Sequence, residues 1–296
     1  MRKKNLLLKE MCLFIHLLLS SFLFTQEKKQ EVVLDESTKS YIESFKDSVK
    51  IDNPYNLIGI GYFDVYMGNN QRGNAIMGYA LSKIPNPDYE LYHELSVQNT
   101  KNGNYKLAFQ YLDIAAKLNP EVYGYYGWVM LYYFRDYERA LKYLEKYDSL
   151  TPNFSDFPEG ENINHLKGMA YMNLKKYNRA IEEFDKYIQE TSLKSGEDWV
   201  EVSTFYYKGL CFQFQKKYED AIINYNKAIK YNDSFTEVYY QKGYCHIALG
   251  EKTNAKDNFQ KSKELFQIGL KKQDVYIEIF HPVYIQDIEK AITLTS

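Results

Sequence analysis

The sequence predicts an all-α protein, a solenoid in which helical hairpins stack in chain order. Three features predict it: alanines that recur along the chain, a bulky side chain four residues after each, and a tyrosine three residues before four of them. Side chains three and four residues apart share one helix face, so each copy of the pattern describes a packing face. The alanines are Ala75, Ala108, Ala140, Ala180, Ala221 and Ala255.

Glycine and proline follow the same register. A glycine stands twelve residues before each of the last three alanines, and a proline stands twelve residues after each of the first three. Small residues allow two helix axes to approach closely, and proline ends a helix. Some of the 30 tyrosines are expected to fill the space between neighbouring hairpins. The residues are Gly168, Gly209, Gly243, Pro87, Pro120 and Pro152.

This pattern resembles the tetratricopeptide repeat (TPR), a 34-residue helical hairpin with the signature W-x2-L-G-x2-Y, then A-x3-F, then P. The best copy is Val202–Ser234, which holds Gly209, Tyr218, Ala221 and Tyr225 at the signature positions. The resemblance implies a right-handed superhelical solenoid with five clear repeats, one degenerate N-terminal repeat and a C-terminal capping helix. Stacking of neighbours supplies the stability of such an array, because one hairpin alone buries too little apolar surface.

The chain is expected to divide into five segments, one of which is the repeat array. The polar stretch before the repeats has Ile42, Phe45 and Val49 at helical spacing, which predicts an amphipathic helix. The segments are a signal peptide (1–25), a polar linker with that helix (26–53), a degenerate hairpin (54–88), the repeat array (89–266) and a capping segment (267–296).

The N-terminus has the pattern of a secretory signal peptide. A basic stretch, Met1–Lys9, precedes an apolar run, Met11–Phe24, which is too short to cross a bilayer comfortably. Cleavage near Thr25 would leave an exported chain, periplasmic or extracellular, with no membrane span. An uncleaved signal anchor is the alternative.

Two insertions lengthen the repeat spacing, at Asn153–Asn162 and Thr191–Asp198, and their composition predicts surface loops. After the last repeat, Pro282 is expected to open a helix that runs through Ile292. We expect it to cap the last hairpin; a role as an interaction segment is the alternative.

The sequence offers no pattern for catalysis. His93, His165, His246 and His281 are far apart, and no metal-ligand spacing, phosphate-binding glycine loop or nucleophile elbow occurs. A formal net charge of −2 argues against nucleic acid as a ligand. We therefore expect no enzyme activity, catalytic residue, metal, cofactor or small-molecule substrate.

Cys211 and Cys245 occupy the same position in adjacent repeats. Neighbouring helices lie about 10 Å apart, whereas a disulfide needs Cα atoms within about 7 Å. Two free, buried thiols are therefore expected.

The resemblance also implies a binding groove, lined by first-helix residues outside the packing motif. Tyrosine and methionine there would offer large contact areas to a ligand. The alternative is that about half of these tyrosines form core between repeats. The predicted groove residues are Tyr125, Tyr126, Tyr132, Tyr133, His165, Met169, Met172, Tyr206, Gln213, Tyr240 and Tyr244.

The expected partner is an extended or helical segment of another exported protein. Chaperone-binding members of the family grip a terminal carboxylate with Lys, Arg and Asn, and that set is missing here, so that ligand is not expected. A structural, self-associating component of a cell-envelope or secretion assembly is the alternative function.

Overall fold

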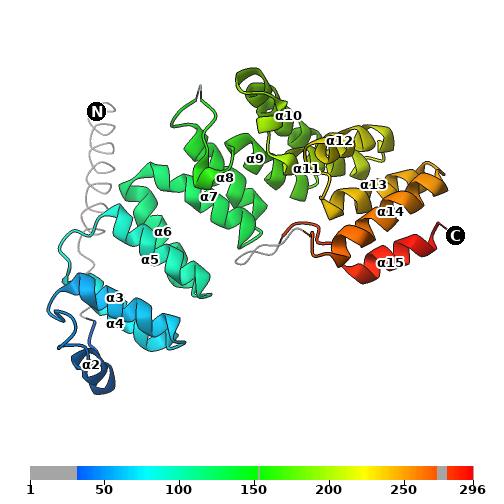
Figure 1. Cartoon of the computed structure of the whole chain (residues 1–296). Coiled ribbons are helices and arrows are strands. Elements are labelled where there is room, and N and C mark those ends of the chain that lie inside the picture. Colours follow the sequence, from blue (N-terminus) through cyan, green and yellow to red (C-terminus); the bar gives the residue numbers. More distant parts are fainter. Residues whose placement is uncertain (1–31, 153, 272–278, 296) are drawn as a thin grey trace, which may run out of the picture. The chain divides into compact units, whose positions relative to one another are not determined.

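The computed structural model describes residues 32–152, 154–271 and 279–295, so the expected signal peptide lies outside the described residues. Every regular element in these ranges is a helix, which confirms the predicted all-α class (Figure 1). No helix within them is long and apolar enough to cross a membrane. The chain forms two compact units, one ending at Leu91 and the other beginning at Tyr92.

The first unit contains α2 (Glu36–Glu43), α3 (Pro54–Tyr66) and α4 (Asn70–Lys83). Asp35 caps α2 by accepting a hydrogen bond from the Thr38 amide, at 2.7 Å. The helix ends at Glu43 and is followed by turns, so it covers only part of the predicted amphipathic stretch, and Val49 is exposed.

The α3–α4 hairpin packs through two glycines. A Cβ at Gly61 would lie 2.8 Å from the Gly73 carbonyl oxygen and 2.5 Å from Met77 Cγ. The predicted register placed Ala75 at this contact, and that prediction is wrong, because Ala75 is only half-buried. Gly73 lies twelve residues after Gly61, the spacing found between glycine and alanine in the later repeats. Glycine thus replaces alanine here.

An ion pair joins the three helices of the first unit. The Arg72 guanidinium donates to both Asp64 oxygens, at 2.7 and 2.8 Å, and lies 3.7 Å from the centre of the Tyr41 ring. Asp64 is completely buried, and Arg72 holds the pKa of its carboxyl below the usual value. Paired in this way, the charge is tolerated inside the fold.

The second unit is an array of helical hairpins. Helix α5 (Tyr89–Lys101) continues into it from the first unit and precedes α6 (Tyr105–Leu118). The next hairpins are α7 (Tyr123–Tyr132) with α8 (Tyr137–Asp148), α9 (Ile163–Asn173) with α10 (Tyr177–Lys194), α11 (Val202–Phe214) with α12 (Tyr218–Tyr231), and α13 (Thr236–Ala248) with α14 (Lys252–Gln267).

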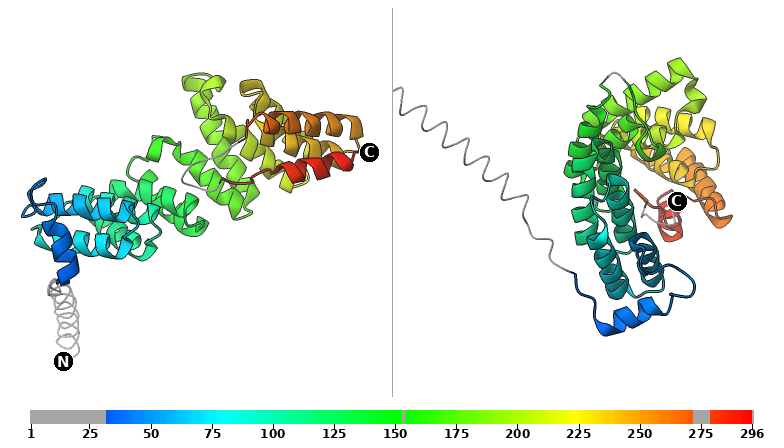
Figure 2. Two further views of the ribbon diagram at one scale, coloured as in Figure 1. Left: turned by 60° about the horizontal axis from the view of Figure 1, so that its bottom comes forward. Right: turned by 90° about the vertical axis from the view of Figure 1, so that its left-hand side faces the viewer.

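Consecutive hairpins stack in chain order, with the second helix of each against the first helix of the next (Figures 1 and 2). The helices in contact are α8 with α9, α10 with α11, and α12 with α13. The predicted solenoid of stacked hairpins is therefore confirmed.

Glycine makes room for a ring within the last three hairpins. A Cβ at Gly168, Gly209 or Gly243 would lie 2.4–2.5 Å from the aromatic ring sixteen residues later, at Phe184, Tyr225 or Phe259. The five later alanines of the register are fully buried, as predicted. Hairpin α7–α8 differs by one position, because Gly127 approaches Leu144, seventeen residues later.

Each hairpin turn holds one residue with a left-handed backbone. Glycine takes this position between α3 and α4, α5 and α6, and α13 and α14, whereas Arg135, Lys175 and Lys216 take it in the other three. A positive φ costs a non-glycine residue about 1–2 kcal/mol, so these three turns carry strain that the packing of the hairpins supports.

Both insertions differ in part from the predicted surface loops. Helix α10 continues to Lys194, because the segment contains no glycine or proline before Gly196. Short 3₁₀ turns follow at η2 (Pro158–Gly160) and η3 (Glu197–Trp199), besides η1 (Pro120–Val122) after α6. Pro158 is buried against Gly124 of α7, so the first insertion packs on the array.

The C-terminal helix α15 (Ile285–Thr293) begins three residues later than predicted. Tyr284 before it is extended, which places Pro282 outside the helix. Helix α15 packs along α14 (Figure 2), where Ala291 joins a buried cluster with Ala255 and Phe259.

Candidate binding groove

A pocket of about 300 Å³ opens beside the first helices of hairpins α7–α8, α9–α10 and α11–α12. Helices α7, α9, α10 and α11 and the insertion before α9 all contribute to its lining. Among the residues that the structure describes, this lining contains two carboxylates and no Lys or Arg. We call it the groove pocket, and it is lined by Tyr132, Phe157, Gly160, Glu161, Asn162, His165, Tyr187, Glu201 and Ser203.

Local capping orients the polar lining. The Asn162 side chain accepts hydrogen bonds from the backbone amides of Asn164 and His165, so α9 begins at the pocket edge. The Glu201 carboxylate accepts from the Ser203 amide at the start of α11. Two helix N-termini with their caps therefore meet at the pocket.

Glu161 links the insertion to α7. One carboxylate oxygen accepts from Trp128 Nε1 at 2.8 Å, and the other accepts from the Tyr132 hydroxyl at 2.7 Å. Burial and the neighbouring carboxylate of Glu161 raise the pKa of Tyr132 well above its usual value, so this hydroxyl stays a donor. The contact holds the pocket wall in one arrangement.

His165 is buried below the pocket surface. Its Nδ1 lies 2.8 Å from Thr204 Oγ1 on α11, and its Nε2 lies 4.0 Å from Glu161. The ring also contacts Phe184, Tyr187 and Tyr207. His165 therefore joins two hairpins.

Seven of the predicted groove residues are buried. Tyr126 stacks on Tyr143 with ring centres 3.9 Å apart, and Tyr206 packs against Tyr207 and Phe235. These seven positions agree with the alternative interpretation, in which such side chains form core between helices. The buried residues are Tyr125, Tyr126, Tyr132, His165, Met169, Met172 and Tyr206.

The other four predicted residues, Tyr133, Gln213, Tyr240 and Tyr244, are half-buried. Gln213 accepts from the Tyr225 hydroxyl at 2.6 Å and donates to Gln241 at 3.0 Å, so it bridges neighbouring hairpins. Tyr240 and Tyr244 pack on each other and on Phe259. Of the eleven predicted residues, the structure brings only Tyr132 and His165 together at the groove pocket.

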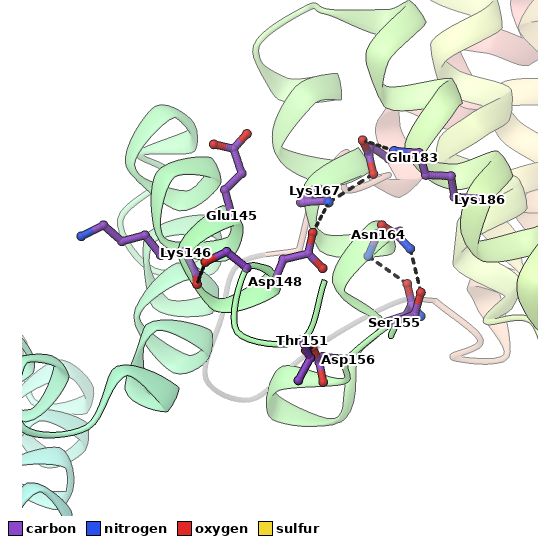
Figure 3. Close-up of polar contacts among 12 residues, drawn as sticks. Glu145, Lys146, Asp148, Thr151, Ser155, Asp156, Asn164, Lys167, Glu183 and Lys186 are labelled. Atoms are coloured by element: carbon purple, nitrogen blue, oxygen red, sulfur yellow. Dashed lines mark hydrogen bonds and ion pairs between the residues drawn. The ribbon is translucent and has the colours of Figure 1, made fainter. Parts of the chain in front are cut away.

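The pocket residues of the insertion and a buried lysine, Lys167, were not predicted from the sequence. Asn162 precedes an apolar helix as an N-cap residue does, and that signal could have placed the start of α9 at a site. Lys167 lies between two carboxylates, 2.9 Å from Asp148 on α8 and 3.5 Å from Glu183 on α10 (Figure 3). Burial lowers the pKa of Lys167, but the two carboxylates outweigh this effect and raise it overall.

Within the described ranges, no group of three or more His, Cys, Asp or Glu side chains is placed to hold a metal ion. Cys211 and Cys245 are buried and free, as predicted. Burial raises the pKa of both thiols, that of Cys245 to about 12, so neither is a reactive thiolate at neutral pH.

The family model described as "Tetratricopeptide repeat" matches residues 162–190, 202–235 and 236–267. These residues of the chain therefore carry three tetratricopeptide repeats. The matched segments correspond to the hairpins α9–α10, α11–α12 and α13–α14, which carry the glycine and ring contact. The repeat is typical of protein-interaction scaffolds without catalysis, and this supports a protein partner for the chain.

One curated relative is "Heat shock protein STI1" of Saccharomyces cerevisiae, 29% identical over 99 residues. The match covers 33% of this chain and 16% of that protein, so the chain spans only a small part of its relative.

Solved structures with a similar fold include "MamA 41-end from Desulfovibrio magneticus RS-1", with a TM-score of 0.52 and 21% identity over 61% of this chain and 96% of that one. A second is "MamA RS-1 ArsTM double mutant", with a TM-score of 0.51 and 20% identity over 61% and 95% of the two chains. At these identities the likeness shows the fold alone.

Proposed function

We propose that this chain is an exported scaffold that holds a segment of another protein in the groove of its repeats, without catalysis. The observation that carries the proposal is the groove pocket, where aromatic rings and hydrogen-bonding groups from four helices and an insertion meet. Such a mixture suits a peptide, whose backbone needs hydrogen bonds and whose side chains offer apolar area. The carboxylates of Glu161 and Glu201 in the described lining favour a segment that is neutral or basic.

Export is part of the proposal and rests on the N-terminal sequence alone. The basic stretch and short apolar run resemble a secretory signal, and a partner would then be met in the periplasm or outside the cell.

The polar groups of the pocket are held in structural contacts, which supports a binding role over catalysis. Both Glu161 oxygens accept hydrogen bonds from the wall, and His165 Nδ1 contacts Thr204.

Affinity capture with a paired variant tests the proposal. The bait is residues 26–296, and the groove variant combines Phe157→Ala with Glu201→Gln, because both side chains line the pocket and are exposed. The control combines Trp199→Ala with Asp198→Asn, an exposed aromatic and an exposed carboxylate outside the pocket lining.

We expect a partner that the wild type and the control variant both retain and the groove variant loses, with all three equally helical by circular dichroism. Retention by the groove variant would place binding elsewhere. Recovery of nothing but the bait would favour the self-associating alternative.

A further inference from the structure

The segment 279–284, between the repeats and α15, buries side chains although it belongs to no helix. Phe280 is 6% exposed and Val283 is 5% exposed, whereas Tyr284 beside them is 56% exposed. An irregular segment that buries an aromatic ring so completely must be seated in a site on the rest of the unit.

Phe280 packs on hairpin α7–α8, which is distant from it in the sequence. Its ring centre lies 5.7 Å from that of Tyr132, at the end of α7, and 6.3 Å from that of Tyr137, at the start of α8. The Arg135 guanidinium, in the turn between the two helices, lies 3.8 Å from the centre of the Phe280 ring. Two aromatic rings and a cation form a site that suits an aromatic side chain. We call these three residues the anchor site.

The anchor site is continuous with the groove pocket through Tyr132. The ring of Tyr132 contacts Phe280, while its hydroxyl donates to Glu161 in the pocket wall. An extended segment that reaches the anchor site therefore lies beside the pocket proposed to hold a partner.

The segment is held in a strained backbone. His281 has a φ of 53° and precedes Pro282, and its ring lies 5.6 Å from Phe214 of α11. A residue before proline avoids the helical regions, and a positive φ is costly for a non-glycine residue. A segment seated at such a cost is more easily displaced than a relaxed one.

We propose that the segment 279–284 is a built-in competitor for the groove, and that the partner is an extended segment whose aromatic side chain displaces Phe280 from the anchor site. This inference rests on the proposed function and names both the partner's chemistry and a means of regulation. The chain then binds its partner in proportion to the fraction of molecules in which the anchor site is vacated.

The test uses a labelled synthetic peptide with the sequence of Ile279–Ile285, bound to residues 26–296 and followed by fluorescence anisotropy. Phe280→Ala in the protein should tighten peptide binding about tenfold, the gain when a site filled nine times in ten becomes empty. The matched control is Tyr284→Ala, which removes an exposed ring from the same segment and should leave affinity unchanged.

Two further variants locate the peptide. Arg135→Ala in the Phe280→Ala background should remove the gain, and a peptide with alanine in place of phenylalanine should bind neither protein. Equal affinity for the wild type and Phe280→Ala, or no binding to either, would overturn the inference. A dimer of the wild type that Phe280→Ala abolishes would also overturn it, because the segment would then act between two copies.

Failure of the inference is distinguishable from failure of the proposed function. If a captured partner needs the groove pocket but binds equally well to Phe280→Ala, the scaffold function is supported. The role of segment 279–284 as a competitor is then rejected. A peptide that gains affinity for Phe280→Ala while no partner is captured supports the anchor site and counts against the proposed function.

Discussion

At the scale of single residues, the second unit depends on a few buried polar side chains that connect hairpins. His165 joins α9 to α11 through Thr204, and Lys167 joins α8 to α10 through two carboxylates. Such contacts fix the spacing of the hairpins, because a buried charge or ring nitrogen without its partner is costly. The spacing of the helices that line the groove pocket therefore depends on these contacts.

Replacement of Lys167 by methionine should lower the free energy of unfolding by about 2–3 kcal/mol. The change leaves Glu183 buried without its central cation; a fully buried pair would cost about 3–5 kcal/mol, but Asp148 is about one-third exposed. Urea unfolding measures it. Lys186→Met is the control, because Lys186 pairs with the same Glu183 from a half-exposed position and should cost under about 1 kcal/mol. Equal losses in the two variants would contradict the role of Lys167.

The docked segment should respond to pH through His281. Burial, and then the positive charge of Arg135, lower the pKa of His281 below its usual value of 6.5, so the docked state favours the neutral ring. Docking is therefore fully supported above about pH 6.5 and weakens as the pH falls below that value. Trp128, with its ring centre 5.1 Å from that of Tyr132, reports docking by fluorescence in a Trp199→Phe background.

The fluorescence of that protein should begin to change as the pH falls below about 6.5, and it should move toward the fluorescence of Phe280→Ala. His281→Asn should flatten the profile. An unchanged signal in the parent protein, or the same profile in both, would show that His281 does not control docking.

At the scale of elements, one contact shapes the repeat: a glycine on the first helix faces a ring on the second. It is present at Gly209 with Tyr225 and at Gly243 with Phe259, and Gly61 with Met77 keeps the same spacing in the first unit. The degenerate segment 54–88 therefore contains a hairpin built like the later ones, although Gly73 replaces its alanine.

Gly209→Ala should destabilise the protein by about 1–3 kcal/mol. The added Cβ would lie 2.5 Å from the Tyr225 ring, and that ring is fully buried and has no room to move. Gly59→Ala is the opposite case, because the position is exposed on α3 with nothing within 4 Å. It should stabilise by about 0.5–1 kcal/mol. Thermal unfolding of both variants checks the pair, and a shift of the same sign in both would contradict the packing argument.

At the scale of the whole molecule, local sequence predicted the repeats because their packing is periodic. The five later alanines are buried where the register put them, and the last three glycines of the register face aromatic rings on the paired helices. The prediction for Ala75 was wrong, because Gly73, two residues earlier, occupies the contact position instead.

The groove could be predicted only in outline. Tyr206 and Tyr240 hold the same repeat position, yet Tyr206 is 1% exposed, packed on Phe235, while Tyr240 is half-buried beside the last helices. Exposure depends on what the next hairpin brings, and one repeat cannot show that. The contact of Phe280 with α7–α8 joins residues far apart in the chain and belongs to no repeat. A periodic pattern therefore could not predict it.

Site-specific photo-crosslinking in cells of the source organism tests directly whether the groove holds a segment of a partner. A photoreactive phenylalanine analogue at Phe157, half-exposed at the pocket, is compared with the same analogue at Trp199, which is exposed outside it. We expect a crosslink to one other protein from position 157, stronger in the Phe280→Ala background, and none from position 199. No crosslink at 157, or the same products from both positions, would contradict a groove that holds a segment of a partner.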